Sequence, residues 1–208
     1  MPWFAPTYNA APQSTQPVVR VNRDSGSREF ALMRWGLVPF WAKDPKFGYS
    51  TINARAEEAA SKPAYREALK KRRCLVPADA FYEWQRTSEK NKQPYAIALK
   101  SGEPCALAGL WESWKPQEGP TLETFTILTT DPNELMQTIH DRMPVILAKD
   151  DWSMWLNPNY DLPVALTKLL IPCPDEWLEK TAVSTLINSV KNDSSECIRP
   201  VRPERTLF

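Results

Sequence analysis

The chain has 208 residues, of which 42% are hydrophobic and 25% are charged, and its formal net charge is +1. This size and composition are typical of one soluble globular domain with a sizeable core. The small net charge excludes a globally basic nucleic-acid-binding protein, so a nucleic-acid partner needs a local basic patch. No apolar run approaches the length of a membrane span, and the start of the chain has no signal-peptide pattern.

The N-terminal part predicts a loop followed by a β-hairpin. Residues 3–17 are punctuated by prolines. Within them Asn9 is either a turn residue or a residue that bonds backbone or a ligand. Residues 17–21 predict a strand, residues 22–27 a turn, and residues 30–35 a second strand.

Phe40 and Trp41 follow Pro39 and are predicted to form a loop tip. Adjacent large aromatic side chains beside Lys43 can stack on nucleobases or wedge between them. Alternatively they plug an edge of the core, and the pair taken in isolation favours this second interpretation.

The next segment predicts two helices. Asn53 can cap the first, which places Arg55 near a helix N-terminus, where a cation is disfavoured. Such an arginine indicates an anionic ligand such as a phosphate, or else a salt bridge to Glu58. Pro63 is predicted to open the second helix, residues 64–71. The basic residues at its end are Arg66, Lys70, Lys71, Arg72 and Arg73. Such a run is typical of a solvated helix terminus, and a phosphate-binding patch is the less favoured alternative.

Residues 74–85 predict strands around a kink at Pro77. Glu83 lies between Tyr82 and Trp84. It either faces water by strand alternation or lies in a low-dielectric pocket that raises its pKa. The second case makes it an acid–base candidate near neutral pH. Further antiparallel strands are predicted at residues 95–99, 106–114 and 124–130.

His140 is the only histidine and the first candidate for proton transfer, because its charge changes near neutral pH. Asp131 is predicted to cap a short helix, with Pro132 at its first position. Met143-Pro144 ends that helix, which places His140 at its C-terminus. The alternative, favoured by spacing alone, is a surface histidine that complements the helix dipole.

The last part predicts two helices, a strand and a polar loop. Asp150 or Asp151 caps a helix that carries Trp155, and Pro163 opens another helix up to about residue 170. No repeat or linker occurs. We therefore expect one α+β domain over residues 1–208, with an antiparallel, barrel-like sheet flanked by short helices.

The chemistry-bearing residue types predict neither a metal nor a cofactor. The four cysteines stand far apart and form no C-x-x-C pair, which argues against zinc. Without a secretion signal, we expect reduced thiols and a cytoplasmic location. The chain has only six glycines, and it contains neither G-x-G-x-x-G nor a Walker A motif.

Four separated blocks occur in an order that resembles the SRAP family, the SOS-response-associated peptidases or abasic-site processing proteins. The blocks are Tyr8–Pro12, Met33–Pro39, Ile52–Glu57 with Phe81–Trp84, and Ile139–Pro144. The tail from Val183 to Ile198 is also similar. The resemblance covers nearly the whole chain, and four ordered blocks are far more specific than any single block.

The resemblance implies binding of single-stranded or junction DNA at abasic sites. It implies a reaction pocket formed by Asn53, Glu83 and His140. For phosphate binding it suggests Arg55, Arg142 and Thr129, and more weakly Lys62. For a wedge against stacked bases it suggests Pro12, Phe40 and Trp41. Further candidates for DNA contact are Asn9 and Trp84. We expect a monomer with no membrane partner and little DNA sequence preference.

In the family, an N-terminal cysteine attacks the sugar aldehyde with its amine, and its thiol then closes a thiazolidine crosslink. Here Pro2 follows Met1, and the first cysteine is Cys74. We therefore expect the family's leading segment to be missing from this sequence. The alternatives are a non-covalent single-stranded DNA-binding protein, or a self-processing peptidase that uses Glu83 and His140. No serine or cysteine motif supports a general protease.

Overall fold

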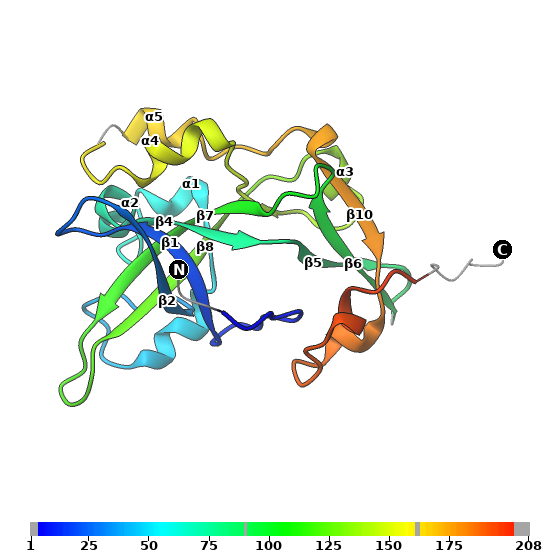
Figure 1. Cartoon of the computed structure of the whole chain (residues 1–208), viewed down its shortest axis with the longest axis horizontal. Coiled ribbons are helices and arrows are strands. Elements are labelled where there is room, and N and C mark those ends of the chain that lie inside the picture. Colours follow the sequence, from blue (N-terminus) through cyan, green and yellow to red (C-terminus); the bar gives the residue numbers. More distant parts are fainter. Residues whose placement is uncertain (1–3, 90, 161–162, 202–208) are drawn as a thin grey trace.

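A closed five-stranded β-barrel forms the centre of the structure (Figure 1). The computed structural model describes residues 4–89, 91–160 and 163–201. The barrel strands are β1 (Thr15–Val21), β2 (Arg28–Trp35), β4 (Arg73–Ala78), β7 (Cys105–Trp114) and β8 (Leu122–Thr130). They pair in the order β2-β1-β4-β7-β8, and β2 pairs back onto β8, which closes the barrel. The predicted α+β fold with a barrel-like sheet is confirmed.

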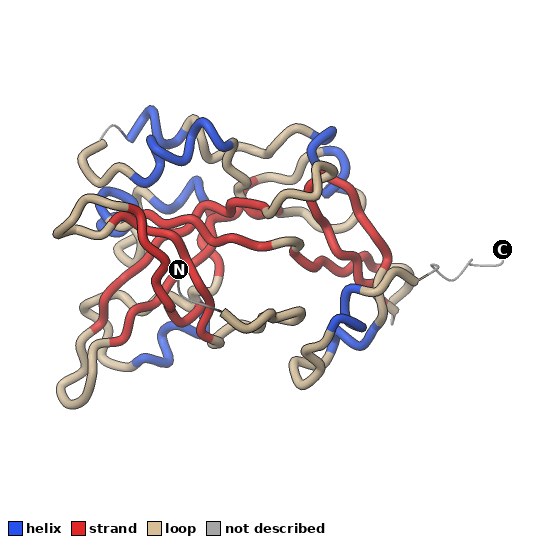
Figure 2. The backbone as a smooth tube through the Cα atoms, viewed as in Figure 1, coloured by secondary structure: helices blue, strands red, loops and turns tan. Residues whose placement is uncertain are grey.

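Short strands and helices complete the molecule, and the helices lie outside the barrel (Figure 2). The remaining strands are β3 (Asn53–Arg55) and β9 (Met143–Pro144), both on β8, and a second sheet of β10 (Leu178–Ala182), β6 (Lys92–Leu99) and β5 (Phe81–Arg86). The α-helices are α1 (Ala56–Ala59), α2 (Arg66–Lys71), α3 (Glu134–Gln137), α4 (Trp152–Leu156) and α5 (Pro163–Thr167). Single 3-10 turns are η1 (Pro45–Ser50), η2 (Lys149–Asp151), η3 (Asp175–Trp177), η4 (Thr185–Asn188) and η5 (Ser195–Ile198). Most pairings are antiparallel as predicted, but β3 and β2 each run parallel to β8.

Strand alternation separates the two largest clusters of the core. Neighbouring residues such as Leu75 and Val76, or Ile127 and Leu128, belong to opposite clusters, because successive side chains of a strand point to opposite faces. One cluster takes residues from all the barrel strands and fills the barrel. The other lies between the barrel and the helices α1, α2, α4 and α5, which cover one side (Figure 1). Among the described residues, no helix is both long and apolar enough to cross a membrane.

Two helix starts differ from the sequence prediction. Asn53 does not cap a helix; it lies in β3, which pairs with β8, and Arg55 takes the N-cap position of α1 without a side-chain cap bond. Helix α3 is capped by Asn133, whose side chain accepts from the Met136 N–H at 3.0 Å. Asp131 was predicted to be this cap, but its carboxylate is instead bonded to Arg142.

The later helices are shorter than predicted. Helix α2 begins at Arg66, two residues after the predicted start, and α5 ends at Thr167. Asp151 occupies the N-cap of α4 but makes no side-chain cap bond. His140 lies three residues beyond the end of α3, and its backbone N–H donates to the Met136 carbonyl at 2.9 Å.

The predicted loop tip at Phe40 and Trp41 is confirmed. Phe40 is 60% exposed and Trp41 is 46% exposed, with the Trp41 ring edge-on to Phe47 at 5.3 Å between centroids. The base of this loop depends on Gly36, whose φ is +120° and whose missing Cβ would lie 2.4 Å from the Gly48 carbonyl oxygen. Only glycine fits such a close approach of two backbones.

Candidate functional site

A pocket of about 260 Å³ lies between β3, β8, β5 and the turn that follows α3. The residues that line it are Asn53, Arg55, Glu83, Thr129, His140, Arg142, Met143 and Pro144. Asn53, Glu83 and His140 come from three separated parts of the chain. Their predicted convergence in one pocket is confirmed, while their chemical roles stay predictions.

Strand β3 presents Asn53 and Arg55 on the same side of the sheet. It runs parallel to β8, with Arg55 opposite Thr129, and the intervening Ala54 is buried on the other side. Both flanking residues are exposed. The Arg55 side chain makes no hydrogen bond or ion pair with any residue that the structure describes. It is therefore a cation at the pocket edge whose donors are available to a ligand.

Glu83 lies on β5 opposite Tyr95 and is partly buried. Burial raises its pKa above the usual range, while the nearby His140 and a hydrogen bond with the Trp84 backbone oppose the shift. Asp141 adds to the rise, and Lys92 opposes it. Of the two sequence interpretations, the low-dielectric pocket is the one that the structure supports.

Replacing Glu83 by glutamine should increase the free energy of unfolding more at high pH than at low pH. A raised pKa means that the folded state binds the proton more tightly, so stability from this group is lost as pH rises through the folded pKa. Glutamine stays neutral and avoids that loss. Urea denaturation of E83Q and parent should therefore agree below about pH 4 and diverge towards pH 8.

The exposed Glu103 on the β6–β7 turn gives the matched control, because E103Q removes the same charge without burial. A stability difference between E83Q and parent that is independent of pH, or that shrinks as pH rises, would contradict a raised Glu83 pKa.

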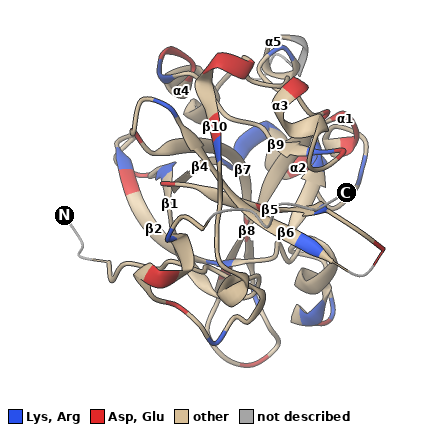
Figure 3. Cartoon of the chain, turned by 90° about the vertical axis from the view of Figure 1, so that its right-hand side faces the viewer, with Lys and Arg blue, Asp and Glu red and all other residues tan. Residues whose placement is uncertain are grey.

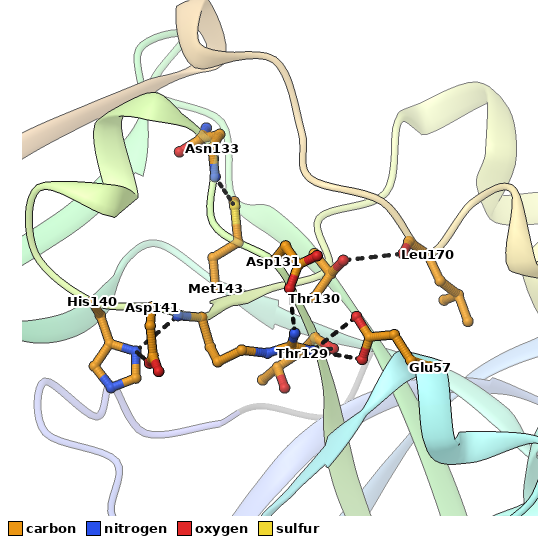
Figure 4. A network of polar contacts seen from close by, with 10 residues as sticks. Glu57, Thr129, Thr130, Asp131, Asn133, His140, Asp141, Met143 and Leu170 are labelled. Atoms are coloured by element: carbon orange, nitrogen blue, oxygen red, sulfur yellow. Dashed lines mark hydrogen bonds and ion pairs between the residues drawn. The ribbon is translucent and has the colours of Figure 1, made fainter.

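His140 is held in a polar network that Figure 4 shows from close by. Its Nδ1 accepts from the backbone N–H of Arg142 at 3.0 Å, and the Asp141 carboxylate lies 3.1 Å from the same nitrogen. The imidazole is 45% exposed. It is therefore accessible to a ligand, and its orientation is fixed through one ring nitrogen.

Arg142 is the centre of this network, and its charge is already paired. Its guanidinium donates to both carboxylate oxygens of Glu57 at 2.8 and 3.1 Å, to Asp131 at 2.7 Å and to the Thr129 carbonyl at 2.7 Å. Burial by itself would raise the pKa of Glu57, but the Arg142 hydrogen bond, a backbone hydrogen bond and the charges of Arg142 and Arg55 together lower that pKa. Sequence reasoning missed Glu57 and Asp131, because nothing in their local sequence identifies Arg142 as their partner.

Asn9 and Trp84 face the C-terminal segment, and neither is among the residues that line the pocket. The Asn9 amide donates to the carbonyls of Ile187, Ser189 and Asn192, which agrees with the backbone-bonding alternative. The Trp84 indole N–H donates to Asn188 at 2.7 Å. Both side chains thus tie distant parts of the chain together.

Three more candidates, Lys62, Phe40 and Pro12, also lie outside the pocket lining. Lys62 is paired with Glu58 at 2.5 Å. Phe40 lines a second pocket of about 520 Å³, together with residues such as Trp111 and Arg72. Pro12 is exposed in the loop before β1.

Charges of both signs are interspersed on the side that carries β5, β6 and β10 (Figure 3). Recognition of an anion on this side therefore depends on individual cations. Within the described ranges, no group of three or more His, Cys, Asp or Glu is placed to hold a metal ion. The four cysteines are free and buried.

The model of the SRAP family, described as SOS response associated peptidase, matches residues 1–190 of this chain. The chain belongs to this family. It is 48% identical over 195 residues to abasic site processing protein YoaM of Bacillus subtilis, covering 94% of this chain and 85% of the relative. It is 36% identical over 227 residues to abasic site processing protein HMCES of Xenopus tropicalis, covering 95% and 67%. A crystal structure of a protein from Bacteroides thetaiotaomicron superposes with a TM-score of 0.82 at 30% identity, covering 91% of this chain and 82% of that one.

Proposed function

We propose that this protein binds single-stranded or junction DNA at abasic sites, with the abasic sugar in the pocket of Asn53, Glu83 and His140. The observation that carries the proposal is that these three polar side chains share one pocket with Arg55, a cation that makes no ion pair with a described residue. The similarity to proteins named for abasic site processing supports the same substrate.

The residue types suit the chemistry of an abasic sugar. The sugar opens from a cyclic hemiacetal to an aldehyde, and both this opening and any attack on the aldehyde require proton transfers. Glu83, whose pKa is raised by burial, and His140 can donate or accept these protons. The Asn53 amide has both a donor and an acceptor with which to orient the sugar or an attacking amine.

Phosphate binding in this proposal depends more on Arg55 than on Arg142. Arg55 has free donors, whereas Arg142 already donates to two carboxylates and a carbonyl. A phosphate at Arg142 has to compete with these partners. The exposed Phe40 and Trp41 supply aromatic surface on which bases can stack. None of these contacts reads base identity, so binding should depend little on sequence.

Loss of the Arg55 side chain should weaken binding to abasic single-stranded DNA about equally for all sequences. It should also reduce the salt dependence of the binding constant by roughly 0.7, the slope expected for one single-strand phosphate. The measurement is a fluorescence-anisotropy titration of R55A and parent at several salt concentrations.

The exposed Lys100 serves as the control, because it lies in the turn between β6 and β7 and does not line the pocket. K100A should retain the parental slope. Equal slopes for R55A and parent would show that Arg55 contacts no phosphate.

The covalent reaction implied by the family resemblance needs an α-amine and a thiol on the same terminal residue. The four cysteines of the printed sequence are internal and buried, and burial raises the pKa of Cys105 to about 11 and that of Cys173 to about 12. We therefore propose that residues 1–208 bind abasic DNA without crosslinking, because none of their cysteines carries a free α-amine.

We further propose a cytoplasmic monomer, since the pocket is completed by residues of one chain and the thiols are free. The pocket lining contains neither a serine nor a cysteine beside Glu83 and His140. A general peptidase is therefore not proposed.

A further inference from the structure

We propose that Arg142 is a positioning residue, and that its backbone N–H holds neutral His140 in the tautomer whose proton is on Nε2. Glu57 and Asp131, which bind the Arg142 side chain, are the residues that fix this geometry. The relevance to chemistry rests on the proposed function, because His140 is taken to act on the sugar. The tautomer itself is a property of the free protein.

The two partners of His140 Nδ1 require opposite protonation states. The backbone N–H of Arg142, at 3.0 Å, can only donate, so Nδ1 must then carry a free lone pair. The Asp141 carboxylate, at 3.1 Å, only accepts when ionised, so Nδ1 must then carry a proton. Nδ1 cannot satisfy both partners at once. The choice between them decides which ring nitrogen is protonated in the neutral imidazole.

The Arg142 N–H is the better placed partner for the neutral ring. The Arg142 side chain is only 15% exposed and is bonded to Glu57, Asp131 and the Thr129 carbonyl. The next residue, Met143, pairs with Thr130 in β8, so the backbone is fixed on that side too. The Asp141 side chain is 87% exposed, and a charge in such a position contributes little to holding a partner.

The tautomer decides what His140 can do in the pocket. With Nδ1 accepting from Arg142, Nε2 carries the proton and is the ring nitrogen that has no hydrogen bond to a described residue. Neutral His140 is then a hydrogen-bond donor to a sugar oxygen, and Glu83 is the group left to act as base. When the ring gains a second proton at Nδ1, it loses the hydrogen bond from Arg142 and donates to Asp141 instead. If this imidazolium then transfers its Nε2 proton to a sugar oxygen, the neutral Nδ1–H tautomer remains.

Charged groups on each neighbouring element affect which ring nitrogen of His140 carries the proton. Glu83 approaches from β5, and Asp141 and Arg142 flank the ring in its own turn. Glu57 acts from α1 only through Arg142. The adjacent Glu58 is bonded to Lys62 instead, which makes it a matched control on the same helical turn.

The experiment is two-bond proton–nitrogen NMR of ¹⁵N-labelled protein without DNA, with the imidazole in its neutral form. One histidine in the chain means one imidazole pattern, with no assignment problem. In the folded protein, we expect the ratio of the Nε2–H to the Nδ1–H tautomer to be about fivefold higher than in the same protein unfolded in urea. This factor is what the net free energy of one hydrogen bond gives. E57A and R142K should move the ratio towards the unfolded value, and E58A should keep the parental ratio.

A parental ratio equal to the unfolded one, or a predominant Nδ1–H form, would overturn the proposal. So would an unchanged ratio in E57A. If E57A or R142K fails to fold, the parental ratio still decides, because it needs no variant. A protein that shows the expected tautomer but binds no abasic DNA would refute the proposed function and leave this inference standing.

Discussion

Residues 2–208 with a fused leader that begins with cysteine should form a heat-stable adduct with abasic single-stranded DNA. The terminal amine attacks the aldehyde and releases water to give an imine. The thiol of the same residue then adds across the C=N bond and closes a five-membered thiazolidine. The 208-residue chain should form no such adduct, because its cysteines are internal and have no free amine. Denaturing gels and mass spectrometry distinguish the two results.

The matched control is the same leader with serine in place of cysteine. It keeps the amine but lacks the thiol, so any adduct should be an imine that survives heating only after reduction. A heat-stable adduct from the 208-residue chain without reductant would show that another group supplies the nucleophile.

Within the fused protein, E83Q and H140Q should each slow adduct formation by about 10²-fold, the lower end of what a general acid or base contributes. Proton transfer is needed when the sugar opens and when water leaves. E103Q, at an exposed site, should react at the parental rate. Parental rates for both E83Q and H140Q would remove these side chains from the reaction, while the DNA-binding proposal would stand or fall separately.

Local patterns predicted the hairpin, the loop tip and the barrel strands, because alternation and turn residues act over a few positions. Asn53 shows where such patterns fail. Its sequence suits a helix cap, but β3 pairs in parallel with β8, more than 70 positions away, and strand pairing prevails. No periodicity within residues 51–60 encodes that partner.

The candidate site shows the same limit at the level of side chains. Arg142 and Glu57 are separated by 85 positions, so their bidentate contact is not visible in either segment. For Glu83, two environments were open from the sequence, since strand alternation does not say what covers each face. The surrounding fold decides that burial raises its pKa.

Arg73 should prove far more important for stability than its place in a basic run suggests. It was predicted to lie in a solvated helix end, but it is only 3% exposed. Its guanidinium does bond the last carbonyls of α2, as a cation at a helix C-terminus should. It also reaches across to a second segment. The carbonyls that it binds are those of Leu69, Lys70, Trp155, Asn157 and Tyr160.

Replacing Arg73 by alanine should lower the free energy of unfolding by at least about 3 kcal/mol, because each buried carbonyl left without a donor costs about 1–3 kcal/mol. The substitution also removes the hydrogen bonds through which Arg73 links α2 to α4, two of the helices that cover one side of the barrel. K70A, which removes an exposed cation from the same run, should change stability by no more than about 0.5 kcal/mol. Urea denaturation of the three proteins measures both effects. A cost below about 1 kcal/mol for R73A would mean that water reaches these carbonyls, since solvated acceptors lose little when a donor is removed.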